Sequence, residues 1–353
     1  MVDLLNTLVY HKIWMIISTN LLIFEGRGFV MRLLLCADVR LAASCTENLD
    51  VKLAHKWQTA RNEKLAELVD LAAQNNAAYI ALFGSMFGRE RVSESVIDSL
   101  FSAINEDKHI QVLTFLSADE FNRINYRNDL PDNLHLICMQ TPDTYTDDNI
   151  ALRINKGCVE IQLADNAPIY IKRSSNGSYC INGIGKERAI PSFEPIGFED
   201  AEGQRFGYGV IEWTNESLCG YTTVKMQRYA YKSVDLKILP SDGEKDIVRK
   251  ISKATKAIDS DSFLRLTLVG SSAFGLTLNA NALEEKLKNK IFFVEVYDNT
   301  IMSIDEEAFE NDISLRSEFV RLALQDDSLS ESERNRLISC GWNALNGGEV
   351  PEE

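Results

Sequence analysis

The pattern of apolar and polar positions begins with alternating strand-like and helix-like segments. Residues 32–37 form a continuous apolar run, as expected for a strand whose sheet is covered on both faces. Residues 52–75 repeat apolar positions at helical spacing. The alternation continues with a strand over Tyr79–Phe83, a helix over Ser93–Asn105 and a strand over Ile110–Phe115. This order predicts a parallel sheet with right-handed crossovers.

The helical pattern weakens between about residue 134 and residue 232. Short strand-like runs are separated there by turns rich in Asn, Gly and Asp. These runs are Leu134–Met139, Cys158–Leu163, Pro168–Lys172, Tyr179–Ile181 and Phe206–Trp213. The pattern predicts a β-rich second half of the same domain, which would cover residues 31–232.

A second α/β pattern starts at Ser233 and predicts a small domain over residues 233–300. Its expected segments are a strand at Val234–Ile238, a helix at Glu244–Ile258, a strand at Phe263–Val269, a helix at Ala280–Lys290 and a strand at Ile291–Tyr297.

Residues 301–353 are predicted to form a pair of helices. Ser330-Glu-Ser-Glu333 is a capping box that starts the second helix, and Gly347-Gly348 would end it. The apolar positions of the pair are Leu315, Phe319 and Leu322 in the first helix and Leu337, Ile338, Trp342 and Leu345 in the second.

The first 30 residues stand apart from this organisation. Residues 8–24 are apolar, but polar residues interrupt them and they fall short of a membrane-spanning helix. No basic start or small-residue cleavage site indicates a signal peptide. We interpret Met31 as the natural start, with residues 1–30 as upstream sequence read in frame. A membrane-associated leader is the alternative.

Composition narrows the possible functions. The chain has 353 residues and a net charge of −15, which suits it poorly to hold nucleic acid by itself, because DNA affinity comes largely from neutralised phosphates. Its seven cysteines include no Cys-x-x-Cys pair. This pattern indicates free thiols in a reducing cytoplasm rather than disulfides or a zinc site.

Three of the predicted parallel strands end in polar or glycine-containing segments. They read Asp38-Val-Arg40, Gly84-Ser85-Met-Phe-Gly88 and Ser117-Ala118-Asp119. Parallel sheets bind ligands beyond the carboxyl ends of their strands, so these segments are the candidate site.

The order and spacing of these strand ends resemble the calcineurin-like metallophosphoesterases, specifically the SbcD/YhaO-type DNA exonuclease subunit. There the three ends read Asp-x-His, Gly-Asp-x-Phe-Asp and Gly-Asn-His-Asp. The likeness continues in Val234–Leu268, Ile291–Asp298 and residues 315–345, and covers most of residues 31–348. It implies an α/β (α+β) fold class: a phosphoesterase β-sandwich flanked by helices, a small α/β capping domain and C-terminal helices.

The resembled family uses two manganese ions, but its ligands do not carry over to this chain. Asp38 and Asp119 match the first and last aspartates, Arg40 stands in place of a histidine, Ser85 replaces the bridging aspartate, and Ser117-Ala118 replace the Asn-His pair. Two clamping metal ions need a bridging carboxylate, which serine does not provide. The chain's four histidines also follow no strand end. We therefore predict that these positions are vestigial, with no metal ion and no catalytic residue.

The substitution at Arg40 suggests what replaces the metal charge. A buried carboxylate without metal or partner is strongly disfavoured. We therefore hypothesise that Arg40 pairs with Asp38 or Asp119. The alternative is that Asp38 caps the following loop or helix.

The resemblance implies a non-catalytic subunit in DNA repair or phage defence. Its partner would be an SbcC-type SMC coiled-coil ATPase that docks on the apolar positions of the C-terminal helix pair, and DNA would bind through the complex. A homodimer is implied as well, and no membrane association. Two alternatives stay open: an active metal-dependent DNA exonuclease with an unusual ligand set, and a protein–protein adaptor without a DNA role.

Overall fold

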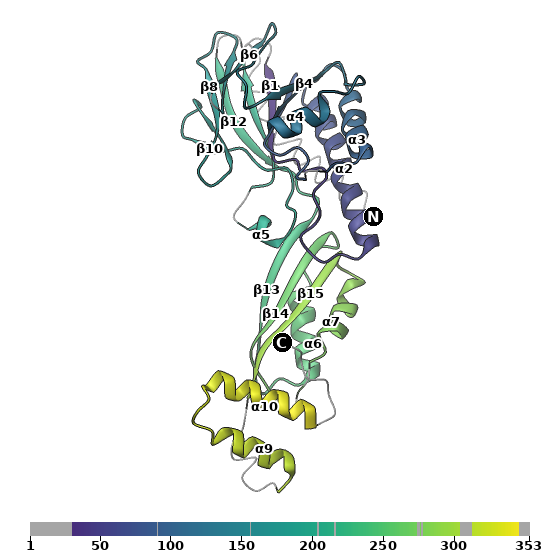
Figure 1. The fold of residues 1–353 in the computed structure, drawn as a ribbon, viewed down its shortest axis with the longest axis vertical. Helices are drawn as coiled ribbons and strands as arrows, with labels where there is room; N and C mark the ends of the chain where they lie inside the picture. Colours follow the sequence, from purple (N-terminus) through teal and green to yellow (C-terminus); the bar gives the residue numbers. More distant parts are fainter. Residues whose placement is uncertain are drawn as a thin grey trace. The chain divides into compact units, whose positions relative to one another are not determined.

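The strands predicted at the start of the chain form the parallel part of a six-stranded sheet in the computed structural model (Figure 1). The sheet order is β12-β11-β1-β2-β3-β4, with β11 and β12 antiparallel to the rest. Its strands are β1 (Met31–Ala37), β2 (Tyr79–Phe83), β3 (Gln111–Leu116), β4 (Leu134–Cys138), β11 (Gly207–Trp213) and β12 (Leu218–Lys225). The predicted α/β fold class and parallel crossovers are thus confirmed.

The structure describes most of the chain and divides it between Arg228 and Tyr229 into two compact units. The sequence interpretation placed this boundary at residue 233. The predicted leader and the predicted helix end at Gly347-Gly348 lie outside the described residues. The described ranges are 30–89, 91–155, 157–202, 205–214, 217–273, 276, 278–303 and 313–345.

Helices cover one face of the first sheet. They are α2 (Val51–Gln74), α3 (Glu94–Asn105) and α4 (Ala118–Ile124). Asp50 caps α2 by accepting a hydrogen bond from the Leu53 amide at 2.8 Å. Buried side chains such as Leu68 of α2 and Ile97 of α3 share one apolar core with Leu34 and Leu82 of the sheet.

The opposite face of this sheet packs on a second, antiparallel six-stranded sheet. Val159, Ile161 and Leu163 alternate toward the shared core, whereas the residues between them face outward. The strands are β5 (Thr144–Thr146), β6 (Ile150–Asn155), β7 (Cys158–Leu163), β8 (Ile169–Arg173), β9 (Tyr179–Asn182) and β10 (Arg188–Ala189). The result is a β-sandwich with helices outside its first sheet.

Several elements were missed by the sequence analysis. The strand β6 was overlooked although its apolar positions Ile150, Leu152 and Ile154 alternate. The others are short or lie at a sheet edge, where the apolar pattern is weak. They are β5, β10, β12, α4 and α5 (Phe198–Ala201).

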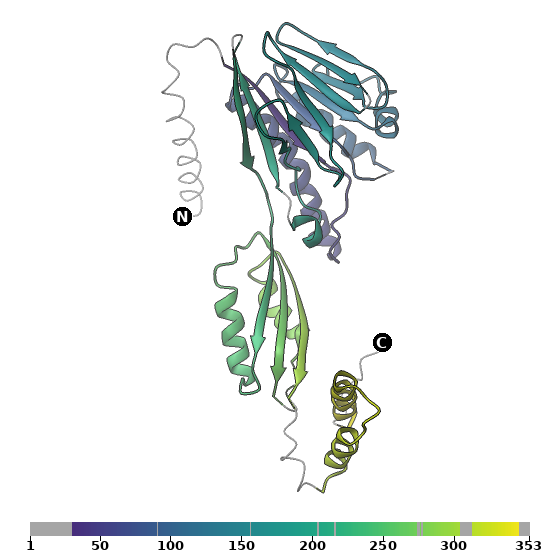
Figure 2. The ribbon, with the colours of Figure 1, turned by 90° about the vertical axis from the view of Figure 1, so that its left-hand side faces the viewer.

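The second unit contains a parallel three-stranded sheet in the order β13-β14-β15. Two helices cover one face of it, as Figure 2 shows, and bury Leu264, Leu266 and Leu268 of the central strand. The elements are β13 (Ala230–Ile238), α6 (Glu244–Ala254), β14 (Ser262–Ser272), α7 (Ala280–Lys288) and β15 (Phe293–Met302).

The two C-terminal helices are α9 (Leu315–Leu324) and α10 (Glu331–Leu345). The predicted capping box at the start of α10 is confirmed. The Ser330 amide donates to Glu333 Oε2 at 2.8 Å, and the Glu333 amide donates to Ser330 Oγ at 3.3 Å. None of the described helices combines the length and the apolar character needed to cross a membrane.

A polar network closes the sandwich edge where β4 meets β5. The ring of His135 hydrogen-bonds to Gln111 Oε1 at 2.7 Å and lies 4.7 Å from the ring of Tyr145, centroid to centroid. The hydroxyls of Tyr145 and Tyr79 both donate to Asp147 Oδ2, at 2.9 and 2.7 Å. His135 is thus held in a partly buried site at the end of both sheets.

This environment predicts a pH dependence of stability. Burial lowers the pKa of His135 below its ordinary value of 6.5, although the charge of Asp147 opposes the shift. The unfolded chain therefore takes up the proton first, and the stability contributed by neutral His135 is present above the ordinary pKa and lost as the pH falls through the lowered one. We expect His135→Gln to flatten this part of the pH profile in urea unfolding. His55→Gln, at an exposed position of α2, is the control and should leave the profile unchanged. Equal profiles for all three proteins would contradict the prediction.

Candidate functional site

The loops that follow β1 and β2 run side by side at the carboxyl edge of the first sheet. Backbone hydrogen bonds join them: the Asp38 amide donates to Phe83 O at 2.8 Å, and the Arg40 amide donates to Ser85 O at 3.1 Å. Because β1, β2 and β3 are parallel, their ends meet at this edge. The predicted site residues are brought together here.

The backbone of the first loop has an unusual conformation. Asp38 and Arg40 have φ values of 50° and 53°. These values lie in the left-handed region, which residues other than glycine rarely adopt. Gly84 has a φ of 78°, and a Cβ atom there would lie 2.4 Å from Asp38 Oδ1. A glycine at position 84 is therefore needed for the close approach of the Asp38 carboxylate to the second loop.

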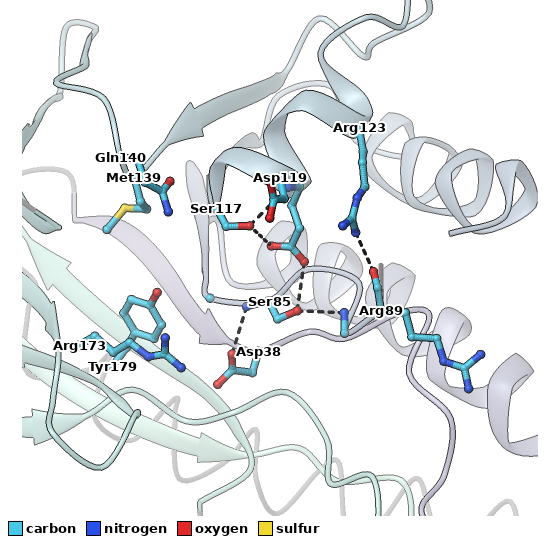
Figure 3. Close-up of a pocket in the computed structure, with 13 residues that line it drawn as sticks. Asp38, Ser85, Arg89, Ser117, Asp119, Arg123, Met139, Gln140, Arg173 and Tyr179 are labelled. Atoms are coloured by element: carbon cyan, nitrogen blue, oxygen red, sulfur yellow. Dashed lines mark hydrogen bonds between the residues drawn. The ribbon is translucent and has the colours of Figure 1, made fainter. Parts of the chain in front are cut away.

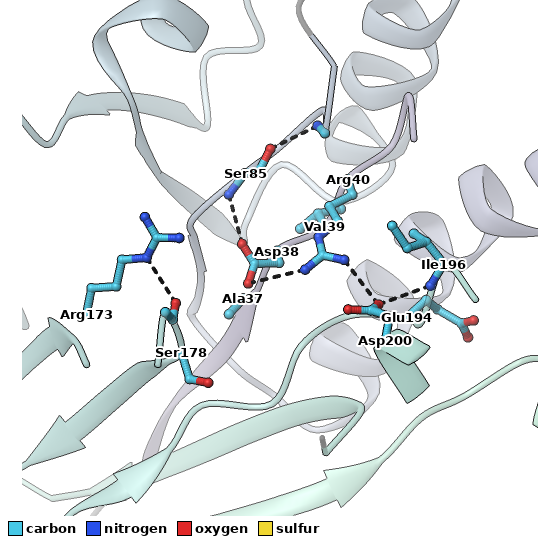
Figure 4. A network of polar contacts seen from close by, with 12 residues as sticks. Ala37, Asp38, Val39, Arg40, Ser85, Arg173, Ser178, Glu194, Ile196 and Asp200 are labelled. Atoms are coloured by element: carbon cyan, nitrogen blue, oxygen red, sulfur yellow. Dashed lines mark hydrogen bonds and ion pairs between the residues drawn. The ribbon is translucent and has the colours of Figure 1, made fainter. Parts of the chain in front are cut away.

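Arg40 is held between two carboxylates, as Figure 4 shows. Its Nη2 atom lies 3.9 Å from Asp38 Oδ2, and its Nη1 atom lies 3.1 Å from Asp200 Oδ2. The hypothesis that Arg40 pairs with Asp38 or Asp119 is thus confirmed for Asp38. The closer partner, Asp200 of α5, was missed, because nothing in the sequence links positions 160 residues apart.

Asp38 does accept a backbone hydrogen bond, but not from the loop or helix that follows it, as the alternative interpretation expected. Its Oδ1 atom accepts a hydrogen bond from the Ser85 amide at 3.1 Å (Figure 4). The capped loop follows β2 and not β1. The carboxylate thus joins the two loops and is already engaged by protein donors.

Glu120 is the residue at the centre of the site that the sequence analysis missed. Its Oε1 atom accepts from Ser85 Oγ at 3.0 Å (Figure 3) and from the Phe87 amide at 3.1 Å. Ser117 Oγ donates to its other oxygen at 3.4 Å. The residue is 7% exposed, so its carboxylate joins the second and third strand ends inside the protein. The Ser-x-x-Glu spacing from Ser117 is a capping-box signal that would have drawn attention to it.

The third strand end leads directly into α4. Ser117 caps this helix by accepting from the Glu120 amide at 3.3 Å, Ala118 is its first residue, and Asp119 is exposed in its first turn. Within the described part of the chain, no ion pair joins Asp119 to Arg40. Ser117, Ala118 and Asp119 thus form the beginning of α4.

A cavity of about 430 Å³ lies over these strand ends. Four of the six predicted positions line it: Asp38, Ser85, Ser117 and Asp119. Arg40, which pairs with Asp38, and Ala118 are not among the lining residues. Further lining residues are Gly84, Gly88, Arg89, Glu120, Arg123, Met139, Gln140, Arg173 and Tyr179.

The donor set of this cavity does not fit two manganese ions. No group of three His, Cys, Asp or Glu side chains among the residues that the structure describes has an arrangement that would hold a metal ion. Asp38 and Glu120 instead accept hydrogen bonds from the protein, and Ser85 contributes a hydroxyl where a bridging carboxylate would be required.

The predicted partner-binding residues of the helix pair have different environments. Leu315, Leu322 and Leu337 are 74%, 60% and 43% exposed. Ile338 is fully buried with Val320, which corrects its assignment to the binding surface: it holds the two helices together. Phe319 and Trp342 are partly buried against this contact, and Leu345 is partly exposed.

No protein-family model and no curated protein matches the chain.

The role of Glu120 in joining the strand ends predicts a large effect on stability. Glu120→Ala leaves the buried Phe87 amide and the Ser85 hydroxyl without their acceptor, so we expect the free energy of unfolding to fall by about 2–4 kcal/mol. Asp119→Ala, at the exposed neighbouring position, is the matched control and should change it by less than about 0.5 kcal/mol. Urea unfolding followed by tryptophan fluorescence measures both. Similar losses in the two variants would show that Glu120 has no special role.

Proposed function

We propose that this protein is a non-catalytic relative of the SbcD/YhaO-type exonuclease subunits. It serves as a scaffold in a cytoplasmic complex with an SMC-type ATPase that acts on DNA ends. The observation that supports the proposal is the network at the strand ends. There, Arg40 and Glu120 engage the positions that would hold metal ions in the resembled family.

The chemistry of the network favours a role without catalysis. A two-metal phosphoesterase generates its nucleophile from metal-bound water and neutralises charge on the attacking and leaving oxygens with the ions. A guanidinium group donates hydrogen bonds and accepts none, so Arg40 is no metal ligand. Asp38 and Glu120 accept hydrogen bonds from Ser85, so their oxygens are committed to holding the fold.

The charge of the chain is consistent with DNA binding through a complex. A net charge of −15 opposes the approach of a polyanion. In the proposed complex the ATPase supplies most of the basic surface that binds DNA. This chain acts as the scaffold that positions the ATPase.

The C-terminal helix pair is the proposed docking surface. Leu315 and Leu322 are seven residues apart on α9, hence on one helix face, and both are largely exposed. Among the residues whose burial the structure describes, the contact between the helices buries a small cluster around Val320, Ala323 and Ile338. A helix pair with so small a core is stabilised when the apolar stripe of a partner coiled coil buries its exposed leucines.

The proposed loss of catalysis predicts an inactive protein. We expect the purified chain, with manganese and a linear DNA duplex, to show no cleavage above the level of its own Asp38→Ala variant. Gel analysis of end-labelled DNA measures this. Manganese-dependent cleavage that Asp38→Ala abolishes would contradict the proposal and support the alternative of an active exonuclease.

The docking surface predicts a selective loss of ATPase binding. We expect Leu315→Glu combined with Leu322→Glu to weaken binding to the SMC-type ATPase of the same genome at least about tenfold, because charges replace buried apolar contacts. Leu239→Glu changes a leucine that is 43% exposed outside the helix pair, and should bind normally. Size-exclusion chromatography and calorimetry give the readout. Equal binding by all proteins would rule out this surface, and a complex that binds no DNA at any salt concentration would favour the adaptor alternative.

A further inference from the structure

The three-stranded sheet of the second unit has one face that is open to solvent. The helices α6 and α7 lie against its other face and cover Leu264, Leu266 and Leu268 of β14 (Figure 2). Successive residues of a strand point to opposite faces, so the residues that alternate with the covered ones form the open face. The centre of this open face consists of Asp235 and Lys237 of β13, Thr267 and Val269 of β14, and Tyr297 and Asn299 of β15.

An open face is unusual for a sheet of this kind. All three strands are parallel, and sheets made only of parallel strands are almost always covered on both faces. Tyr297 is 47% exposed, and Ile301, which follows on the same face of β15, is 56% exposed. The open face is therefore a candidate contact surface.

Two charges of opposite sign on the open face have no partner. Asp235 and Lys237 are exposed and two residues apart on β13, so both side chains point to the same side. Among the described residues neither side chain forms an ion pair or a hydrogen bond. Arg265 and Glu295, which lie next to them on this face, form an ion pair with each other. The face thus presents one unpaired acid beside one unpaired base, and its four charges sum to zero.

The strand register makes this face complementary to itself. It joins the three strands in level rows, of which two are Asp235–Thr267–Tyr297 and Lys237–Val269–Asn299. Two such sheets can stack face to face about a twofold axis that lies between them, perpendicular to the strands and level with Leu236. Each of the two rows then lies opposite the other row of the second copy. Asp235 faces Lys237 of the second copy, and Lys237 faces Asp235 of the second copy.

We propose that the open face binds a second copy of this chain, with Asp235 and Lys237 of each copy paired to Lys237 and Asp235 of the other. A twofold contact uses one patch twice and so requires a patch that complements itself, as this one does. Val269, Tyr297 and Ile301 add apolar surface around the two ion pairs. A polyanion would find no net positive charge here, which excludes DNA as the occupant. A face of only three strands is small for an interface, so we expect a weak dimer.

Sedimentation velocity of the full chain over a concentration series tests the proposal. We expect the average mass to rise from that of the monomer toward that of the dimer between about 1 μM and about 100 μM, the range of a weak interface. Raising the salt concentration should lower the association, because it screens the two exposed ion pairs.

Charge exchange tests the pairing itself. Asp235→Lys and Lys237→Asp should each weaken self-association about tenfold or more, because each places like charges opposite each other at two points of the contact. The double variant Asp235→Lys, Lys237→Asp should restore it, since both pairs form again with their charges exchanged. An equimolar mixture of the two single variants should associate too, because one copy then carries both positive charges and the other both negative charges.

Control variants separate this surface from others. Lys245→Asp makes the same change of charge at an exposed position of α6 and should associate like the unchanged protein. Leu315→Glu combined with Leu322→Glu alters the proposed ATPase-docking helix and should also leave self-association unchanged. Circular dichroism and thermal melting check the fold of each variant.

The outcomes decide between the possible occupants of the open face. A monomer at every concentration, or a dimer that all variants form equally well, would overturn the proposal. Failure of both the double variant and the mixture to associate would overturn the pairing of Asp235 with Lys237. Loss of the dimer in the variant at Leu315 and Leu322 would assign the contact to the helix pair instead. None of these results depends on whether the ATPase binds, so this inference and the proposed function fail independently.

Discussion

A buried carboxylate requires hydrogen-bond partners, and the way in which Glu120 obtains them organises the site. Its two oxygens accept from Ser85, Phe87 and Ser117, which belong to the second and third strand ends. Asp38 makes the matching connection between the first and second ends. These contacts fix the loops from inside the protein, so the strand ends hold their arrangement through protein groups alone.

The ion pair of Arg40 completes this arrangement. In a metal centre, positive charge at the strand ends comes from the ions, which neutralise the surrounding carboxylates. Here a guanidinium between Asp38 and Asp200 supplies that charge and also ties α5 to the first strand end. An arginine stabilises the two acids through its charge, and it does so without activating water.

Two arginines that line the cavity come from different layers of the sandwich. Arg173 is the last residue of β8 in the second sheet, and Arg123 lies on α4. The face-to-face packing of the two sheets brings them to the same cavity.

The sequence by itself determined the alternation of strands and helices at the start of the chain and the parallel sheet that these strands form. It also placed Asp38, Ser85 and Ser117 at one edge, because apolar periodicity identifies strands and parallel strands end together. Only the tertiary structure decided that Asp200 pairs with Arg40, that Glu120 joins the loops, and that Arg173 and Tyr179 face the cavity. Periodicity assigns a side chain to one face of its own element. The partner it meets there depends on how distant loops and a second sheet pack, and no local pattern records that.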